Sequence, residues 1–200
     1  MEWIIGIVML MLGFLLDRLW ERWKKSKAGL TGQAHNIIKQ LGSSVQAYDG
    51  HYYLSKDPTQ NYKIADHVYK HCAGDVIATC FRENPASYKD HDLARLLPKG
   101  ASFSRVTNDQ VCSPQDKDVA EGILKGLVPN SNIVVIPSSE YITSIDGIFC
   151  ELSDETDIAF VTFPKMSDEN NNRGIIFYGH TAKAFYEYYR DLRNTYLKTD

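Results

Sequence analysis

The strongest constraint lies at the start of the chain, where an uninterrupted apolar run covers residues 3–16 (WIIGIVMLMLGFLL). As a helix this run rises about 21 Å, which is short of the roughly 30 Å hydrocarbon layer of a bilayer. Extension as far as Trp23, with Asp17 and Arg18 reaching towards the headgroups, supplies the missing length. The pattern predicts one transmembrane helix within residues 1–27, in contact with membrane lipid.

Basic residues follow the apolar run, whereas only the amino terminus and Glu2 precede it. The basic residues are Arg18, Arg22, Lys24, Lys25 and Lys27. Because positive charge collects on the cytoplasmic side of a span, we expect a single-pass protein of the inner (plasma) membrane, with its N-terminus outside and the remainder in the cytoplasm. Tryptophans at both ends of the span suit the membrane interface, and they are Trp3, Trp20 and Trp23.

Two other interpretations of the apolar run are open. A cleaved signal peptide carries its positive charge before the apolar run, and here the charge comes after it. A buried helix of a globular domain is the second alternative for so short a run. Within the span, Gly6 and Gly13 lie seven residues apart on one helix face, so they either let two spans pack closely or are ordinary membrane glycines.

The remaining 150 or so residues suffice for one domain with its own core. The net charge is −3 although the N-terminal segment is basic, so the soluble part is acidic, and no specific nucleic-acid partner is expected. The four cysteines form no C-x-x-C pair and are expected to be buried thiols: Cys72, Cys80, Cys112 and Cys150. Neither a metal site nor a bound cofactor is expected.

Residues 28–51 are expected to form a linker with a short helix over 34–42, and residues 52–200 the domain. Helices and strands then alternate, which is typical of helices packed on a largely parallel sheet. The expected helices span 57–73, ended by Gly74, 90–97 and 115–127, and the expected strands span 75–81, 101–107 and 132–137.

The C-terminal third contains strand-like runs joined by short turns, which favours antiparallel pairing. The runs cover 141–152, 157–164 and 174–179, with SDENNNRG at 167–174 expected as a hairpin loop. A last helix is expected to begin at a Thr181 cap, and an apolar stripe of Phe185, Tyr189, Leu192 and Tyr196 is expected to face the core. The fold class is an α/β sandwich with a mixed sheet.

The run YKIADHVYKHCAGDVIATCFRENPASYKDHDLARLL, followed by ASFSRVT, resembles the opening of a phospholipase D-like domain, in which a helix, a strand, a helix and a second strand follow one another. The strand runs DIAFVTFP and RGIIFYG with the helix AKAFYEYYRDLRNTY are similar to the last hairpin and final helix of that superfamily. The resemblance covers roughly residues 52–198. It implies a single α/β/α sandwich with a mixed sheet.

The superfamily's chemistry depends on a His-x-Lys-x4-Asp signature, in which the histidine attacks phosphorus, the lysine binds phosphate oxygens and the aspartate supports the histidine. If Asp146 occupies the aspartate position, Ser139 and Tyr141 occupy those of the histidine and lysine. Phosphohistidine chemistry cannot run without its nucleophile, so no catalytic residue is predicted. The alternative is a displaced site made by His180, Lys183 and Asp146, in a membrane-bound nuclease or phospholipase.

The resemblance favours a catalytically inactive cytoplasmic module that binds a ligand as a sensor, or that serves in assembly. In active single-domain members two copies complete one site, which implies a homodimer or higher oligomer. A small anionic or nucleotide ligand is expected in the remaining cleft, held by Ser139, Tyr141, Asp146, Arg82 and Asn84. A role in a defence or stress response is a further hypothesis.

Overall fold

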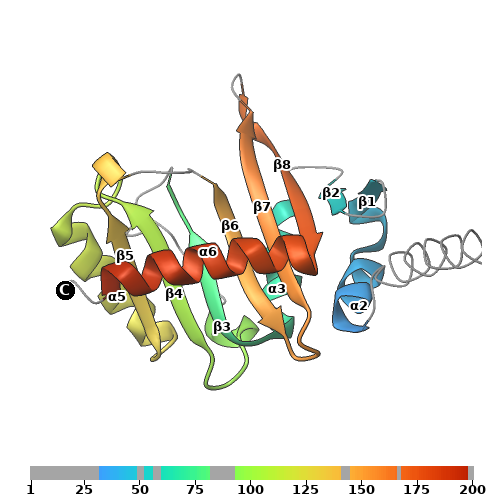
Figure 1. Ribbon diagram of the computed structural model, residues 1–200, viewed down its shortest axis with the longest axis horizontal. Coiled ribbons are helices and arrows are strands. Elements are labelled where there is room, and N and C mark those ends of the chain that lie inside the picture. Colours follow the sequence, from blue (N-terminus) through green and yellow to red (C-terminus); the bar gives the residue numbers. More distant parts are fainter. Residues whose placement is uncertain are drawn as a thin grey trace, which may run out of the picture. The chain divides into compact units, whose positions relative to one another are not determined.

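Eight strands form one mixed sheet in the computed structural model, which describes residues 32–48, 52–55, 60–81, 93–140, 145–165 and 168–197. The strands are β1 (Val45–Tyr48), β2 (Tyr52–Ser55), β3 (Cys72–Thr79), β4 (Ser102–Asn108), β5 (Ser131–Ile136), β6 (Asp146–Leu152), β7 (Asp157–Lys165) and β8 (Asp168–Tyr178). The order across the sheet is β1-β2-β8-β7-β6-β3-β4-β5 (Figure 1). The helices are α2 (Gly32–Leu41), α3 (Asn61–His71), α4 (Leu93–Leu96), α5 (Pro114–Leu127) and α6 (His180–Leu197), with 3-10 turns η1 (Gly42–Ser44) and η4 (Ser138–Glu140).

The sheet has a parallel part and an antiparallel part, as the sequence predicts. Strand β4 pairs in parallel with both β3 and β5. The pairs β3 with β6, β6 with β7, and β7 with β8 are antiparallel. Strands β6, β7 and β8 follow one another without an intervening described helix, and a short connection can join only antiparallel neighbours.

Helices cover both faces of the sheet. Figure 1 shows α6 lying across one face, with α3 and α5 behind the sheet. Alternate residues of each strand point to opposite faces, so Val106 of β4 joins the core under α6 while Phe103 contacts Tyr69 of α3, with ring centroids 6.0 Å apart. The described residues confirm the predicted mixed α/β fold with a mixed sheet.

The core under α6 is largely aromatic. Tyr189 is almost fully buried and stacks on Phe149 of β6, with ring centroids 4.5 Å apart. Phe185, Leu192 and Tyr196 pack against the same cluster. The expected stripe on the last helix is therefore confirmed as core packing.

Two local expectations are wrong. The helix expected to close at Gly74 ends at His71, and Gly74 lies within β3. Cys72 already pairs with Leu152 of β6, so pairing with the sheet takes over before the glycine is reached. The expected loop at 167–174 is mostly strand, because β8 begins at Asp168 and pairs with β7 along a long hairpin. Backbone hydrogen bonds to a facing strand outweigh the weak strand preference of asparagine and aspartate there.

The helix α5 begins where local chemistry specifies it. The Ser113 hydroxyl accepts from the backbone N–H of Asp116 at 3.2 Å, and the Asp116 carboxylate accepts from the backbone N–H of Ser113 at 3.4 Å. Pro114 occupies the first turn, where no N–H is needed. This capping box satisfies two backbone donors at the helix start.

The segment expected as a linker contains elements of the fold. The helix α2 agrees with the short helix expected over 34–42, and it buries Ala34, Ile37 and Leu41. After it, β1 pairs with β2, and β2 pairs with β8. The compact unit that holds the sheet extends over Gly32–Asp200.

The predicted span and its flanking residues lie outside the described residues. They include Trp3, Gly6, Gly13, Arg18, Trp20, Arg22, Trp23, Lys24, Lys25 and Lys27. Of the helices that the structure describes, none combines the length and apolar character needed to cross a bilayer.

Candidate functional site

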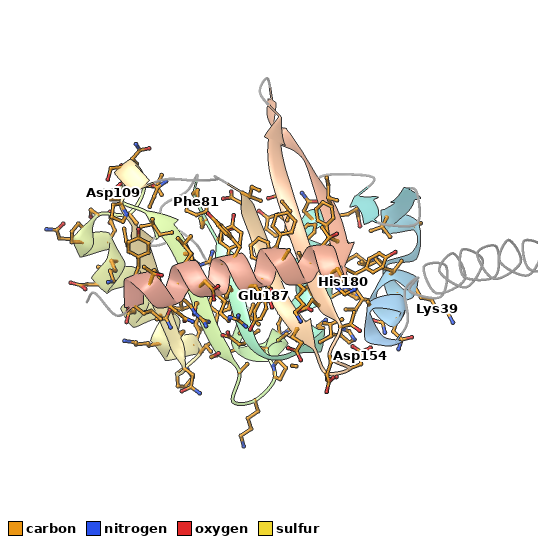
Figure 2. The ribbon with its side chains drawn as sticks, in the orientation of Figure 1. Lys39, Phe81, Asp109, Asp154, His180 and Glu187 are labelled. Atoms are coloured by element: carbon orange, nitrogen blue, oxygen red, sulfur yellow. The ribbon has the colours of Figure 1, made fainter. Side chains whose placement is uncertain are left out.

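One edge of the sheet collects the ends of the parallel strands. Strands β3, β4 and β5 end there, and β6, which is antiparallel to β3, begins there. Figure 2 labels Phe81 and Asp109 on this edge, with Asp154 at the opposite edge. We call it the carboxyl edge. Ligands of open α/β sheets bind at such an edge, which makes it the candidate site.

Asp146 lies at the carboxyl edge as the first residue of β6. Its Oδ1 accepts a hydrogen bond of 2.8 Å from the backbone N–H of Phe81, which follows β3. Its carbonyl oxygen accepts from the Thr162 hydroxyl of β7 at 3.3 Å. The carboxylate thus joins the end of one strand to the start of its neighbour.

Thr79 also joins β3 to β6 at this edge through hydrogen bonds, and the sequence did not indicate this role. Its side chain is 5% exposed, and its hydroxyl donates to the Ile145 carbonyl and accepts from the Gly147 N–H at 2.8 Å. These partners lie more than 60 residues further along the chain. No local pattern signals such a contact, because it depends on β6 lying beside β3.

Ser139 also lies at the carboxyl edge, in the 3-10 turn η4. Strand β5 ends at Ile136 because Pro137 has no N–H for the ladder. The turn is held by Asp109, whose Oδ1 accepts from the Ser138 N–H at 2.9 Å. The Ser139 side chain is exposed.

The other three candidate ligand residues lie outside the described residues: Arg82, Asn84 and Tyr141. The two that are described, Ser139 and Asp146, share the carboxyl edge. The grouping of the five residues in one ligand site stays a prediction.

The residues of the alternative catalytic set do not converge. His180 is the first residue of α6 and is exposed, and it follows the turn at Gly179, which has a φ of +63°. Asp146 pairs with Thr162 on β7, whereas Tyr178, two residues before His180, pairs with Ile158. Four residues of strand separate those levels by about 13 Å. Figure 2 likewise labels His180 at the end of α6, away from the carboxyl edge.

Lys183, the third member of that set, points along α6 towards Glu187, with Nζ 3.9 Å from the carboxylate. Both side chains are about half exposed, so the pair is solvated. The arrangement places no lysine of this set beside Asp146. The chemistry of a displaced phosphohistidine site is therefore not assembled from these three residues.

A polar cluster under α6 is the other arrangement that the sequence did not indicate. Arg193 donates through one guanidinium nitrogen to both oxygens of Asp75 in β3, at 2.7 and 2.8 Å. The Tyr186 and Ser102 hydroxyls donate to the same carboxylate at 3.0 and 2.7 Å. Burial, then the neighbouring Asp75, raise the pKa of Tyr186. Since Asp75 and Arg193 stand 118 residues apart, the cluster ties the last helix to the sheet.

We expect Arg193→Ala to lower the free energy of unfolding by about 2 kcal/mol, measured by urea denaturation of the full chain. The Arg193 side chain is 12% exposed and Asp75 28%, so the loss leaves a carboxylate in a partly desolvated place. The matched control is Lys183→Ala on the same helix, whose exposed pair should contribute less than about 0.5 kcal/mol. Equal effects of the two substitutions would show that the cluster does not stabilise the fold.

The four cysteines are free and buried, as expected. Burial raises the pKa of Cys72 to about 11 and raises the pKa values of Cys112 and Cys150. Thiols of this kind stay protonated at neutral pH and are weak nucleophiles. Among the residues that the structure describes, no group of three or more His, Cys, Asp or Glu side chains is placed to hold a metal ion.

No protein-family model matches this chain, and no curated protein matches its sequence. Solved structures with a similar arrangement include TrmBL2, an archaeal chromatin protein whose structure shows a novel mode of DNA binding, at 7% identity and a TM-score of 0.49, covering 94% of this chain and 66% of that one. They also include the yeast tyrosyl-DNA phosphodiesterase, at 11% identity and a TM-score of 0.36 over 56% of this chain and 27% of the enzyme. A mutant of the yeast enzyme aligns at 10% identity and a TM-score of 0.39, over 63% and 31%.

This chain thus spans about two thirds of the chromatin protein and less than a third of the phosphodiesterase chains. Each of these TM-scores is below 0.5, so the similarities carry no argument about what this chain binds or catalyses.

Proposed function

We propose that this chain is a membrane-anchored, catalytically silent phospholipase D-like module whose cytoplasmic domain binds a ligand or serves in assembly. The order of elements supports the phospholipase D-like part of the proposal. After α2, β1 and β2, a helix, a strand, a helix and a second strand follow as α3, β3, α4 and β4, and the hairpin β7–β8 with α6 closes the domain. This is the order that the resemblance implies.

The single observation that supports the absence of catalysis in this proposal is the hydrogen bond that the Asp146 carboxylate accepts. In the signature an aspartate supports the attacking histidine, whereas here the Asp146 carboxylate accepts from the Phe81 backbone and joins two strands. The histidine position holds Ser139, and a serine hydroxyl is a weak nucleophile without an adjacent base. Asp146 and Asp109 both accept hydrogen bonds from backbone N–H groups, which supports a structural role for these carboxylates.

The proposed ligand is a small anion or nucleotide at the carboxyl edge. Arg82 directly follows Phe81 in the sequence, and its permanent positive charge is the group proposed to bind the anion. Asn84 and Tyr141 add polar groups that suit phosphate or base recognition. The carboxylates of Asp109 and Asp146 would repel an anionic ligand, and the positive charge of Arg82 would offset that repulsion.

The proposed anchor is the segment 1–27, with the domain on the cytoplasmic side of the bilayer. Its support is the apolar run, the basic residues after it and the flanking tryptophans. Such an anchor would tether the domain to the bilayer. Oligomers of the domain would then assemble in the plane of the membrane.

Fractionation of cells expressing the full chain tests the anchor. We expect the protein in the membrane pellet, resistant to high salt and to alkaline carbonate, and released by detergent. A variant carrying both Met9→Arg and Leu12→Arg should move to the supernatant, since each arginine costs about 2.5–3.5 kcal/mol at the centre of a span. The matched control, Met9→Leu, should stay in the pellet. Wild-type protein in the supernatant would overturn the anchor.

Phosphodiester turnover by the purified full chain tests the silent character. We expect no activity above the detergent blank on a chromogenic phosphodiester, for the wild type and for His180→Ala alike. Activity in the wild type that disappears in His180→Ala would establish the displaced-site enzyme in place of the silent module.

A further inference from the structure

We propose that the solvent face of α5 is a self-association surface, on which a second copy of this chain packs its own α5 in the antiparallel direction. The inference specifies an interface for the assembly role and rests on that part of the proposed function. It places the contact on a helix outside the carboxyl edge. Figure 1 shows α5 at the end of the sheet formed by β4 and β5.

The outer face of α5 carries large apolar side chains that the domain leaves uncovered. Val119 is 56% exposed and Ile123 is 52% exposed, whereas Ala120 and Leu124, on the inner face, are buried. Residues 119 and 123 are one turn apart, so they lie side by side on the helix surface. A soluble helix ordinarily places polar residues on this face.

Two glycines lie on the same face, and the fold does not require either of them. A Cβ at Gly122 or at Gly126 would meet no atom within 4 Å, and neither has a positive φ. Glycine inside a helix is less favourable than alanine. The domain therefore carries a cost in helix stability for which its own packing gives no reason.

The face is complementary to itself. Positions 119, 122, 123 and 126 follow the i, i+3, i+4, i+7 spacing of one seam. In an antiparallel pair centred between residues 122 and 123, Val119 of one copy lies opposite Gly126 of the other, and Ile123 lies opposite Gly122. Each large side chain then meets a position without a side chain, which lets the two helices approach closely.

Charges on the flank of the seam favour the same pairing. Asp118 and Lys125 are seven residues apart on one side of the seam, and both are exposed. Rotation about the two-fold axis keeps this side on the same side of the pair and reverses its direction. Asp118 of each copy therefore lies near Lys125 of the other, and Lys125 also pairs with Glu121 of its own helix at 2.5 Å. This charge complementarity favours a second copy in the antiparallel direction.

Cysteine cross-linking in membranes of cells that express the full chain tests the contact. The native cysteines are buried, so a cysteine introduced at an exposed position reacts selectively with a short bismaleimide. We expect Ile123→Cys, close to the two-fold axis, to give a covalent dimer in high yield. Lys99→Cys, exposed in the turn before β4, is the matched control and should give none above the native chain.

Substitution of the glycines separates association from folding. Gly122→Leu and Gly126→Leu should each raise the dimer dissociation constant about tenfold or more, because the side chain fills the space needed by the other copy. Each should leave the thermal midpoint of the dilute protein unchanged or higher, since leucine favours the helix. Asp118→Lys and Lys125→Asp should each weaken the dimer, and the double variant should restore it.

Equal cross-linking of Ile123→Cys and Lys99→Cys would overturn the interface, and so would Ile123→Cys adducts that contain other proteins only. Dimers that survive Gly126→Leu but dissociate on Gly6→Leu with Gly13→Leu would place association in the span instead of α5. These results leave the fractionation and turnover tests unaffected, so failure of the interface is distinct from failure of the proposed function.

Discussion

Phe149→Ala lowers the free energy of unfolding by about 3–5 kcal/mol, the largest loss that we expect from a single substitution in the described part of the chain. Phe149 is fully buried at the centre of β6, between the sheet and α6. It stacks on Tyr189 at 4.5 Å and contacts Phe185 at 5.9 Å between ring centroids. Truncation removes buried apolar surface and leaves a cavity that two aromatic neighbours cannot fill.

Urea denaturation monitored by circular dichroism measures this loss, with the slope checked for two-state behaviour. The control is Tyr62→Ala, an aromatic truncation at a side chain that is 76% exposed, which should change the stability by less than about 0.5 kcal/mol. Comparable effects at both positions would mean that α6 does not pack on the sheet through Phe149.

The second large effect is expected from Gly147→Ala, a substitution that adds a single methyl group. A Cβ at this position would stand 2.7 Å from the Phe149 ring and 2.9 Å from the Phe160 carbonyl oxygen. The carbonyl belongs to the backbone of β7 and cannot rotate away, so the strands must shift. We expect a loss of about 3 kcal/mol.

The same shift should disturb the carboxyl edge, because the Gly147 N–H donates to Thr79 and the preceding residue is Asp146. Thermal unfolding of Gly147→Ala beside Gly74→Ala checks the expectation. Gly74 lies in β3, where a Cβ meets nothing within 4 Å, so its replacement should leave the midpoint unchanged or raise it. A midpoint for Gly147→Ala equal to that of Gly74→Ala would contradict the close packing at β6.

The sequence by itself determined the alternation of helices and strands, the change to antiparallel pairing and the buried stripe on α6. Each helix and strand shows its own spacing of apolar residues over a short stretch of chain, and an apolar face must be buried whatever it packs against. The same local signals failed at Gly74 and at residues 167–174, where pairing with a neighbouring strand outweighed a helix end and a polar composition.

Only the tertiary structure decided which polar side chains meet. Asp146 and Phe81 are 65 residues apart, and Asp75 and Arg193 are 118 apart. Their contacts depend on the order of strands in the sheet, on which face each side chain occupies and on where α6 crosses. No spacing along the chain encodes these three quantities for residues so distant, because they arise from packing of the whole core. The strand order also separates His180 from Asp146, although their residue types alone suggest a shared site.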